Sequence, residues 1–115
     1  MAILLAVAAV FASVLLAQPA SANDTLHYKG AVAETDDNPG NGAASWIWIS
    51  AGSLNWDFRA ANLEYQLING TSDVLYANRG EAVARSLNSE LKAIRLCVYT
   101  NYGDGYYCSD WRYYA

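Results

Sequence analysis

Two cysteines near the C-terminal end constrain the fold of this 115-residue chain more than any other feature. Cys97 lies in residues 94–99 and Cys108 in residues 106–113, and in both segments the residue type alternates. A period of two is typical of half-buried strands. The connection between them, residues 100–105, contains two glycines and an Asp, which favour a tight turn. The pattern predicts a β-hairpin closed by a Cys97–Cys108 disulfide.

The disulfide also predicts the register of the hairpin. The expected cross-strand pairs beside it are Tyr99 with Tyr106, Arg95 with Asp110, and Ile94 with Trp111. One face of the hairpin would then carry the sulfurs and a charge pair, and the other would carry apolar side chains. Closing a loop of this length stabilises a chain by about 3 kcal/mol on the chain-entropy account.

The first 22 residues are predicted to be a secretion signal. Residues 2–17 are almost wholly apolar, and Ala20, Ser21 and Ala22 supply the small residues that a signal peptidase reads. No Lys or Arg precedes the apolar run, which leaves an uncleaved anchor as the alternative. We expect cleavage after Ala22 and export of residues 23–115, which exposes both cysteines to an oxidising compartment.

The exported part is predicted to be a flexible N-terminal segment, residues 23–43, followed by one β domain, residues 44–115. A short strand over residues 26–32 is the alternative for part of the first segment. Residues 34–42 collect Asp, Asn, Pro and Gly, which favour turns. From residue 44 onward, alternation indicates strands near residues 45–50, 54–59, 63–67 and 73–78, with a bulge or turn at residues 60–62.

Residues 81–92 fit two interpretations. Val83, Leu87 and Leu91 are spaced as on a helix, whereas the short strands on either side favour a strand over residues 82–87. We favour the strand. The chain is then all-β, a small antiparallel sandwich or barrel of six or seven short strands.

Composition limits the function. The net charge is −4 and no basic cluster occurs, which argues against nucleic acid or an anionic membrane as partner. His27 is the only histidine, which excludes histidine triads and histidine-rich metal sites, and paired cysteines supply no thiolate. Two carboxylates can hydrolyse glycosides, but no pair is placed by the sequence. We therefore expect no catalytic residue, no cofactor and no metal.

Two polar motifs have ordinary explanations. Four residues could offer oxygens to calcium, but their spacing fits no known calcium loop and favours a flexible acidic linker. They are Asp36, Asp37, Asn38 and Asn41. Asn23 and Asn69 match the glycosylation pattern. The Ala-rich composition is typical of a bacterial chain, so we interpret Asn69 as a turn residue.

Aromatic residues are the most suggestive feature for function. Nine Tyr and four Trp exceed the needs of one thin core, and the terminal hairpin holds six of these tyrosines. Exposed aromatics stack on sugar rings or anchor protein interfaces, while the alternative is packing around the disulfide. The candidate contact surface is the hairpin tip and its aromatic face, namely Tyr99, Tyr102, Asp104, Tyr106 and Tyr107.

The terminal hairpin resembles that of a group of small exported actinobacterial proteins. The resemblance lies in Arg95-Leu96-Cys97 followed by Cys108-Ser109-Asp110-Trp111, an R-x-C…C-x-x-W pattern, and covers about the last fifth of the chain. It implies a signal peptide, a β-rich body and an extracellular location, and it carries over no catalytic residue. The tyrosine-rich connection departs from the acidic one expected of the group.

Together these features predict a secreted, monomeric, non-enzymatic binding protein. Its expected partner is an extracellular protein or polysaccharide, with no membrane contact after cleavage of the signal. The alternatives are a carbohydrate-binding module, an inhibitor of a secreted hydrolase, and a small carboxylate-dependent hydrolase.

Overall fold

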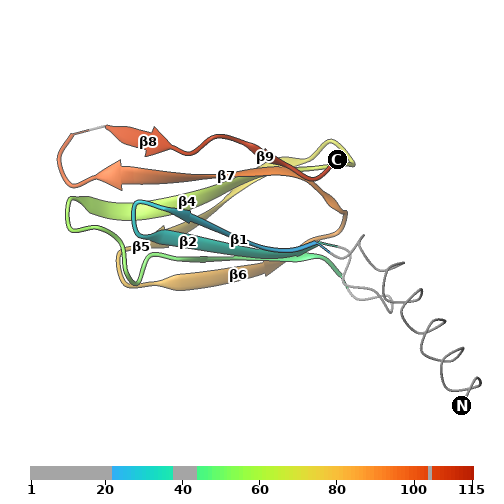
Figure 1. Ribbon diagram of the computed structural model, residues 1–115, viewed down its shortest axis with the longest axis horizontal. Helices are drawn as coiled ribbons and strands as arrows, with labels where there is room; N and C mark the ends of the chain where they lie inside the picture. The colour runs from blue at the N-terminus through green and yellow to red at the C-terminus, as the bar shows by residue number, and fades with distance from the viewer. Residues whose placement is uncertain (1–21, 38–43, 104) are drawn as a thin grey trace, which may run out of the picture.

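A computed structural model of the chain describes residues 22–37, 44–103 and 105–115. Two antiparallel sheets pack face to face (Figure 1). The first, in the order β1-β2-β3-β6, comprises β1 (Ala22–Tyr28), β2 (Ala31–Asp37), β3 (Trp46–Ser50) and β6 (Ala82–Ser86). The second, in the order β5-β4-β7-β8, comprises β5 (Ser72–Asn78), β4 (Phe58–Leu67), β7 (Leu91–Thr100) and β8 (Tyr106–Cys108), and β9 (Arg112–Tyr113) also pairs with β7. The predicted all-β sandwich is confirmed.

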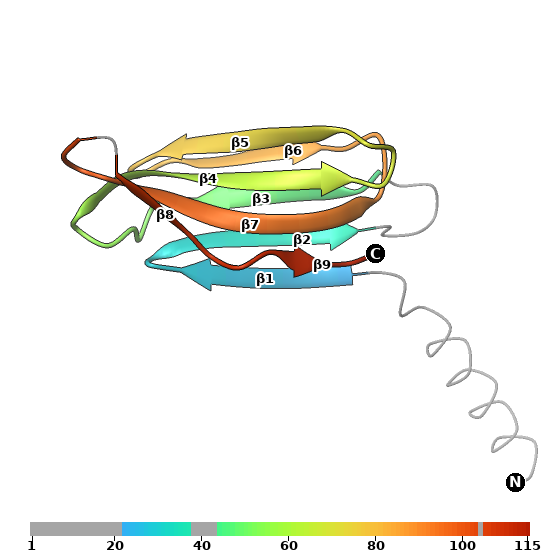
Figure 2. The same cartoon turned by 90° about the horizontal axis from the view of Figure 1, so that it is seen from above.

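The core fills the space between the two sheets, whose strands run in nearly the same direction (Figure 2). Each strand contributes alternate side chains, as the period of two requires. The largest fully buried aliphatic side chains are Ile47, Ile49, Leu63, Leu91, Ile94, Leu96 and Val98. Trp46 and Trp48 occupy the intervening positions of β3 and remain partly exposed. No described residue belongs to a helix that could cross a membrane.

The expected flexible segment, residues 23–43, is wrong for its first part, because β1 and β2 form a regular hairpin from Ala22 to Asp37. Only small or polar side chains, those of Ala31, Ala33, Thr35 and Asp37, point inward from β2, so the strand has no hydrophobic alternation in sequence. The β domain therefore includes β1 and β2, which raises the number of strands above the expected six or seven. The predicted signal, Ala22 excepted, and residues 38–43 lie outside the described residues.

Asp37 has a structural role in place of the predicted linker role. Its carboxylate is buried and accepts hydrogen bonds from the Leu91 amide at 2.8 Å and the Ser45 hydroxyl at 3.1 Å. A buried carboxylate needs such donors, because burial without them costs several kcal/mol. Asp37 thus ties the end of β2 to the start of β7 in the other sheet.

Residues 82–86 form strand β6, so the strand interpretation of the ambiguous segment is confirmed. The expected strand over residues 54–59 is wrong: residues 51–57 form a loop and β4 begins at Phe58. The bulge or turn expected at residues 60–62 is also wrong, because these residues pair regularly with both neighbouring strands, and the register shift of β4 lies between Phe58 and Ala60. Asn69 is a turn residue as predicted, since its side-chain oxygen accepts a hydrogen bond from the Thr71 amide at 3.0 Å.

The register of the terminal hairpin is partly as predicted. Cys97 lies opposite Cys108 and forms the disulfide, and Tyr99 lies opposite Tyr106. The predicted pairs of Arg95 with Asp110 and of Ile94 with Trp111 are wrong, because Ile94 lies opposite Arg112.

Ser109 explains this one-residue shift. Its amide donates to the Leu96 carbonyl at 2.8 Å, and its hydroxyl accepts from the Leu96 amide at 3.0 Å. A side-chain oxygen therefore takes the place of a main-chain carbonyl in the ladder, and residues 109–111 form a bulge between β8 and β9.

An ion pair joins β1 to the C-terminal end of the chain. Arg112 lies 2.9 Å from the Asp24 carboxylate, and the Tyr114 hydroxyl donates to the same carboxylate at 2.6 Å. Partial burial opposes ionisation of Asp24, but the bonds from Tyr114 and Arg112 outweigh it and lower the pKa of Asp24 below its ordinary value. Burial, followed by the bond to Asp24, raises the pKa of Tyr114. This contact fastens the edges of the two sheets together.

Substitution of Asp24 should therefore have a pH-dependent cost. A carboxyl group whose pKa is lowered on folding stabilises the fold above its ordinary pKa, and this contribution disappears as the pH falls through the folded value. We expect Asp24→Asn to lower the free energy of unfolding by about 1 kcal/mol at neutral pH, with a smaller loss near pH 3. Urea unfolding at both pH values measures the difference, and Asp110→Asn, an exposed carboxylate, is the control. Equal losses at the two pH values would contradict the expectation.

Candidate functional site

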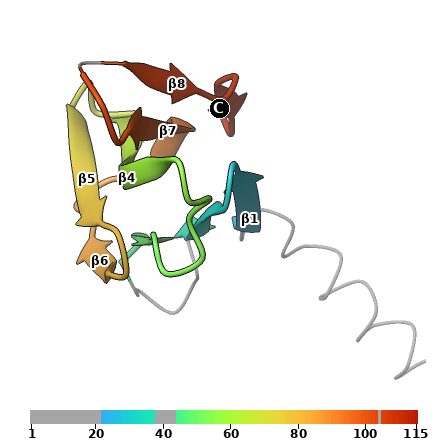
Figure 3. The same cartoon turned by 90° about the vertical axis from the view of Figure 1, so that its left-hand side faces the viewer.

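Four connections gather at one end of the sandwich, on the left in Figure 1 and facing the viewer in Figure 3. They join β1 to β2, β3 to β4, β5 to β6 and β7 to β8. We call this surface the loop end and define it as residues 28–31, 51–57, 78–81, 100–103 and 105. Main-chain hydrogen bonds link residues 51–57 to each of the other three connections.

The loop of residues 51–57 is held from two sides. The Arg79 guanidinium donates to the carbonyl oxygens of Leu54 at 3.1 Å and Asn55 at 2.7 Å, and also to that of Phe58. Gly30 lies against the same loop with a φ of +88°, and a Cβ added there would meet the Ser53 carbonyl oxygen at 2.5 Å. Only glycine fits this position, because it tolerates both the left-handed backbone and the close approach.

The tip of the β7–β8 hairpin is fastened to the same loop. The Asn101 amide donates to the Asp57 carbonyl at 3.0 Å, and the Asn101 side chain donates to the Trp56 carbonyl at 2.8 Å. Within the tip, the Thr100 hydroxyl donates to the Tyr102 carbonyl at 2.7 Å. These bonds fix the main chain on both sides of two aromatic residues.

Trp56 and Tyr102 are those residues, and their side chains point into solvent. Trp56 is 83% exposed and Tyr102 is 87% exposed. Large aromatic side chains normally lose water-accessible surface on folding, so such exposure on a fixed backbone marks a surface that can bind another molecule. The indole and phenol rings offer apolar area together with hydrogen-bonding groups.

The five residues predicted from sequence as one contact surface are divided among several surfaces. Tyr102 lies at the loop end as expected. Tyr99 and Tyr106 lie on the outer face of the second sheet, with ring centroids 5.8 Å apart. Tyr107 points to the opposite side, where its ring meets Phe58 edge-on and the Lys29 ammonium lies 5.8 Å from its centroid. Asp104 lies outside the described residues.

Tyr99 is the most constrained of these tyrosines. Its ring lies between those of Tyr76, with ring centroids 6.0 Å apart, and Tyr106. Its hydroxyl accepts a hydrogen bond from the side-chain amide of Asn62 at 2.5 Å. Burial, followed by the neighbouring Glu64 carboxylate, raises the pKa of Tyr99. Tyr99 therefore supports the outer face by packing, which is the alternative role predicted for the hairpin tyrosines.

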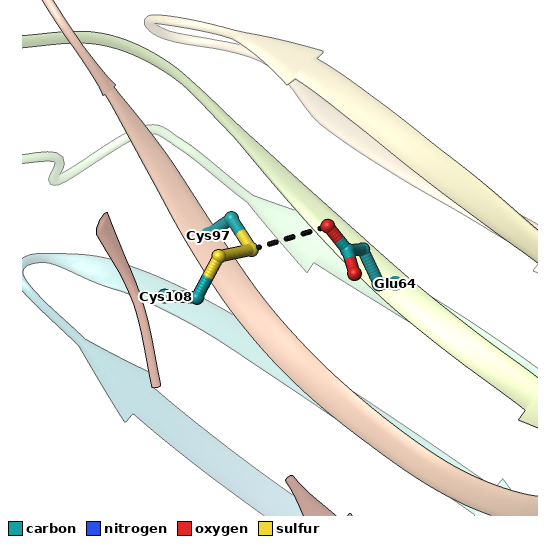
Figure 4. A group of neighbouring side chains, drawn as sticks. All are labelled: Glu64, Cys97 and Cys108. Atoms are coloured by element: carbon teal, nitrogen blue, oxygen red, sulfur yellow. Dashed lines mark hydrogen bonds between the residues drawn. A yellow bond between two sulfur atoms is a disulfide. The ribbon is translucent and has the colours of Figure 1, made fainter. Parts of the chain in front are cut away.

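The disulfide lies on this outer face beside a carboxylate (Figure 4). Glu64 Oε2 is 3.4 Å from Cys97 Sγ, and Glu64, Cys97 and Cys108 place their ligand-type atoms within 4.8 Å of one another. Metal binding by cysteine requires the thiolate, which a disulfide sulfur does not offer. In the oxidised chain this cluster therefore acts as a covalent crosslink packed against an ion-paired carboxylate.

Sequence reasoning missed Trp56 because Leu54, Trp56 and Phe58 mimic the alternation of a strand. In the structure Leu54 lies in the loop and Phe58 lies at the start of β4, and both side chains are buried. Of the three residues, only Trp56 points outward. The preceding Ala51-Gly52-Ser53 step was a signal for a turn, and it extends to a loop of seven residues, 51–57.

Comparison with protein-family models, with curated proteins and with solved structures gave no match for this chain.

Proposed function

We propose that this protein is secreted and acts without catalysis, as a monomeric module that binds an extracellular protein through the loop end. Export is supported by the apolar run of residues 2–17, by the small residues at positions 20–22 and by the Cys97–Cys108 disulfide, since disulfides persist in oxidising compartments. The resemblance of the terminal hairpin to exported actinobacterial proteins agrees with this location.

The observation that carries the proposal is the pair of exposed aromatic residues on a fixed backbone. Trp and Tyr are enriched among the few residues that provide most of the binding energy in protein interfaces. Binding through a loop that is already ordered costs less conformational entropy than binding through a mobile one. Trp56 and Tyr102 combine both properties, because their own main chains are held by Asn101 and Thr100.

Truncation of either ring should therefore abolish capture of the partner. Residues 23–115 are immobilised and incubated with the proteins of the medium in which the source organism grows. We expect at least one protein to be retained by the wild type and reduced at least about tenfold by Trp56→Ala or Tyr102→Ala, in line with the loss of an aromatic anchor. Quantitative mass spectrometry of the retained proteins measures this effect.

Tyr113→Ala is the matched control, because Tyr113 is 63% exposed but lies in β9 and outside the loop end. It should leave capture unchanged. Equal retention by the wild type and both loop-end variants would contradict the proposal. If the captured protein is a hydrolase that loses activity on addition of the chain, the binding protein is also an inhibitor.

A further inference from the structure

A groove of about 380 Å³ crosses the outer face of the second sheet, away from the loop end. Its lining residues are Glu64, Tyr65, Gln66, Ser72, Asp73, Val74 and Trp111. The volume falls in the range of about 300–1,000 Å³ that is usual for small-molecule sites. No part of the proposed function uses this groove.

The pairing of β4 with β5 builds the floor of the groove. Glu64 lies opposite Val74 and Gln66 lies opposite Ser72, so all four side chains point outward from the sheet. The bulge at residues 109–111 builds the wall, because it brings Trp111 over Arg95, whose guanidinium carbon lies 4.8 Å from the ring. This stacking fixes the indole ring beside the polar floor.

The groove contains charged groups that are already paired. Glu64 binds Arg95 at 2.9 Å, whereas Asp73 points to the opposite face of β5 and lies 3.3 Å from Arg85. An anionic ligand would have to compete with Glu64 for the Arg95 guanidinium, and a cationic ligand would have to compete with Arg95 for the Glu64 carboxylate. The electrostatics of the groove therefore favour a ligand without net charge.

The hydrogen-bonding groups of the groove indicate the chemical class of ligand that it can bind. The Glu64 carboxylate accepts hydrogen bonds, while the Gln66 side-chain amide and the Ser72 hydroxyl both donate and accept. A ligand rich in hydroxyl groups satisfies such a mixed set, and a sugar ring also presents an apolar C–H face that packs on an indole. We propose that this groove binds a neutral saccharide, with Trp111 as the stacking platform and Gln66 and Ser72 as hydroxyl partners.

Isothermal titration calorimetry with defined oligosaccharides tests the proposal. The neutral probes are cellohexaose, maltohexaose, mannohexaose and N-acetylchitohexaose, and the charged probes are hexagalacturonate and the glucosamine hexamer. At least one neutral probe should bind residues 23–115 with a Kd of about 1 mM or tighter, and each charged probe should bind more weakly than it. Absence of binding by all four neutral probes, or preference for a charged one, would overturn the proposal.

Variants assign the binding to the groove. Trp111→Ala should weaken the affinity for the neutral probe on the order of tenfold, whereas Trp111→Phe, which keeps a ring, should retain most of it. Gln66→Ala should weaken it at least about threefold, and it keeps the assignment testable if the Trp111 variants fail to fold. Unchanged affinity in Gln66→Ala and in the folded Trp111→Ala protein would overturn the proposal.

Trp56→Ala separates this inference from the proposed function. Trp56 lies at the loop end and should leave saccharide affinity unchanged while it abolishes capture of a protein partner. Loss of saccharide binding in Trp56→Ala with full binding in Trp111→Ala would place the saccharide at the loop end and overturn the assignment of the groove.

Discussion

Replacing both Cys97 and Cys108 with alanine is expected to lower the free energy of unfolding by about 3 kcal/mol. The crosslink joins residues separated by 11 positions at the end of the β7–β8 pair that lies away from the turn, and its loss frees this loop in the unfolded chain. Domains of this size are typically stable by about 5–15 kcal/mol, so the change removes a large share. Guanidinium unfolding followed by tryptophan fluorescence measures it.

A reductant supplies the control for this prediction. Unfolding of the wild type in the presence of a strong dithiol should shift toward that of the double variant, whose own curve should not change with the reductant. A loss below about 1 kcal/mol would mean that the strand pairing alone holds the hairpin together, in contradiction to the prediction.

Arg79→Ala is expected to lower the free energy of unfolding by about 2–3 kcal/mol. The guanidinium donates hydrogen bonds to the carbonyl oxygens of Leu54, Asn55 and Phe58, and its removal leaves these oxygens without a charged donor. Because the same bonds fix the loop that carries Trp56, amide hydrogen exchange in residues 52–57 should accelerate, and partner capture should fall with it. Urea unfolding and exchange mass spectrometry provide the two readouts.

Arg79→Lys and Lys92→Ala are the matched variants. Lysine keeps the charge but lacks the planar fork that reaches several carbonyls at once, so Arg79→Lys should recover only part of the loss. Lys92 is exposed on β7, and its replacement should change stability by less than about 0.5 kcal/mol. Unchanged exchange in residues 52–57 of Arg79→Ala would contradict the proposed role of the guanidinium.

Strands whose inward residues are large and apolar were predictable from the sequence. Ile47 and Ile49 in β3, and Ile94, Leu96 and Val98 in β7, alternate with polar or aromatic residues and are buried as expected. The pairing of Cys97 with Cys108 followed from the same alternation. In these elements local pattern and tertiary packing favour the same structure.

β1 and β2 were not predictable in the same way, because the core accepts alanine, threonine and a hydrogen-bonded aspartate from β2. Burial of Thr35 and Asp37 depends on partners that are distant in sequence, such as the Leu91 amide. The shift beyond Cys108 has a similar origin. It depends on the Ser109 hydroxyl, which accepts a hydrogen bond from the Leu96 amide in place of a main-chain carbonyl, and a hydrophobic pattern cannot predict such a bond.

The candidate site was predictable only in part. Tyr102 was identified because a turn tip rarely serves the core, and its exposure agrees. Trp56 reaches the same end of the molecule from β3–β4, and this proximity follows from sheet topology rather than from spacing along the chain. The groove below Trp111 depends on the bulge at residues 109–111, so it too required the folded register.

Arg79 and Asn101 bind the loop of residues 51–57 through its carbonyl oxygens, which every amino acid possesses. The conformation of the loop that Arg79 and Asn101 stabilise therefore does not depend on the side chains of Trp56 and Asp57. Randomising these two positions should yield libraries of variants that keep one scaffold and differ in recognition. The sandwich thus offers a small, single-disulfide framework for engineered affinity reagents.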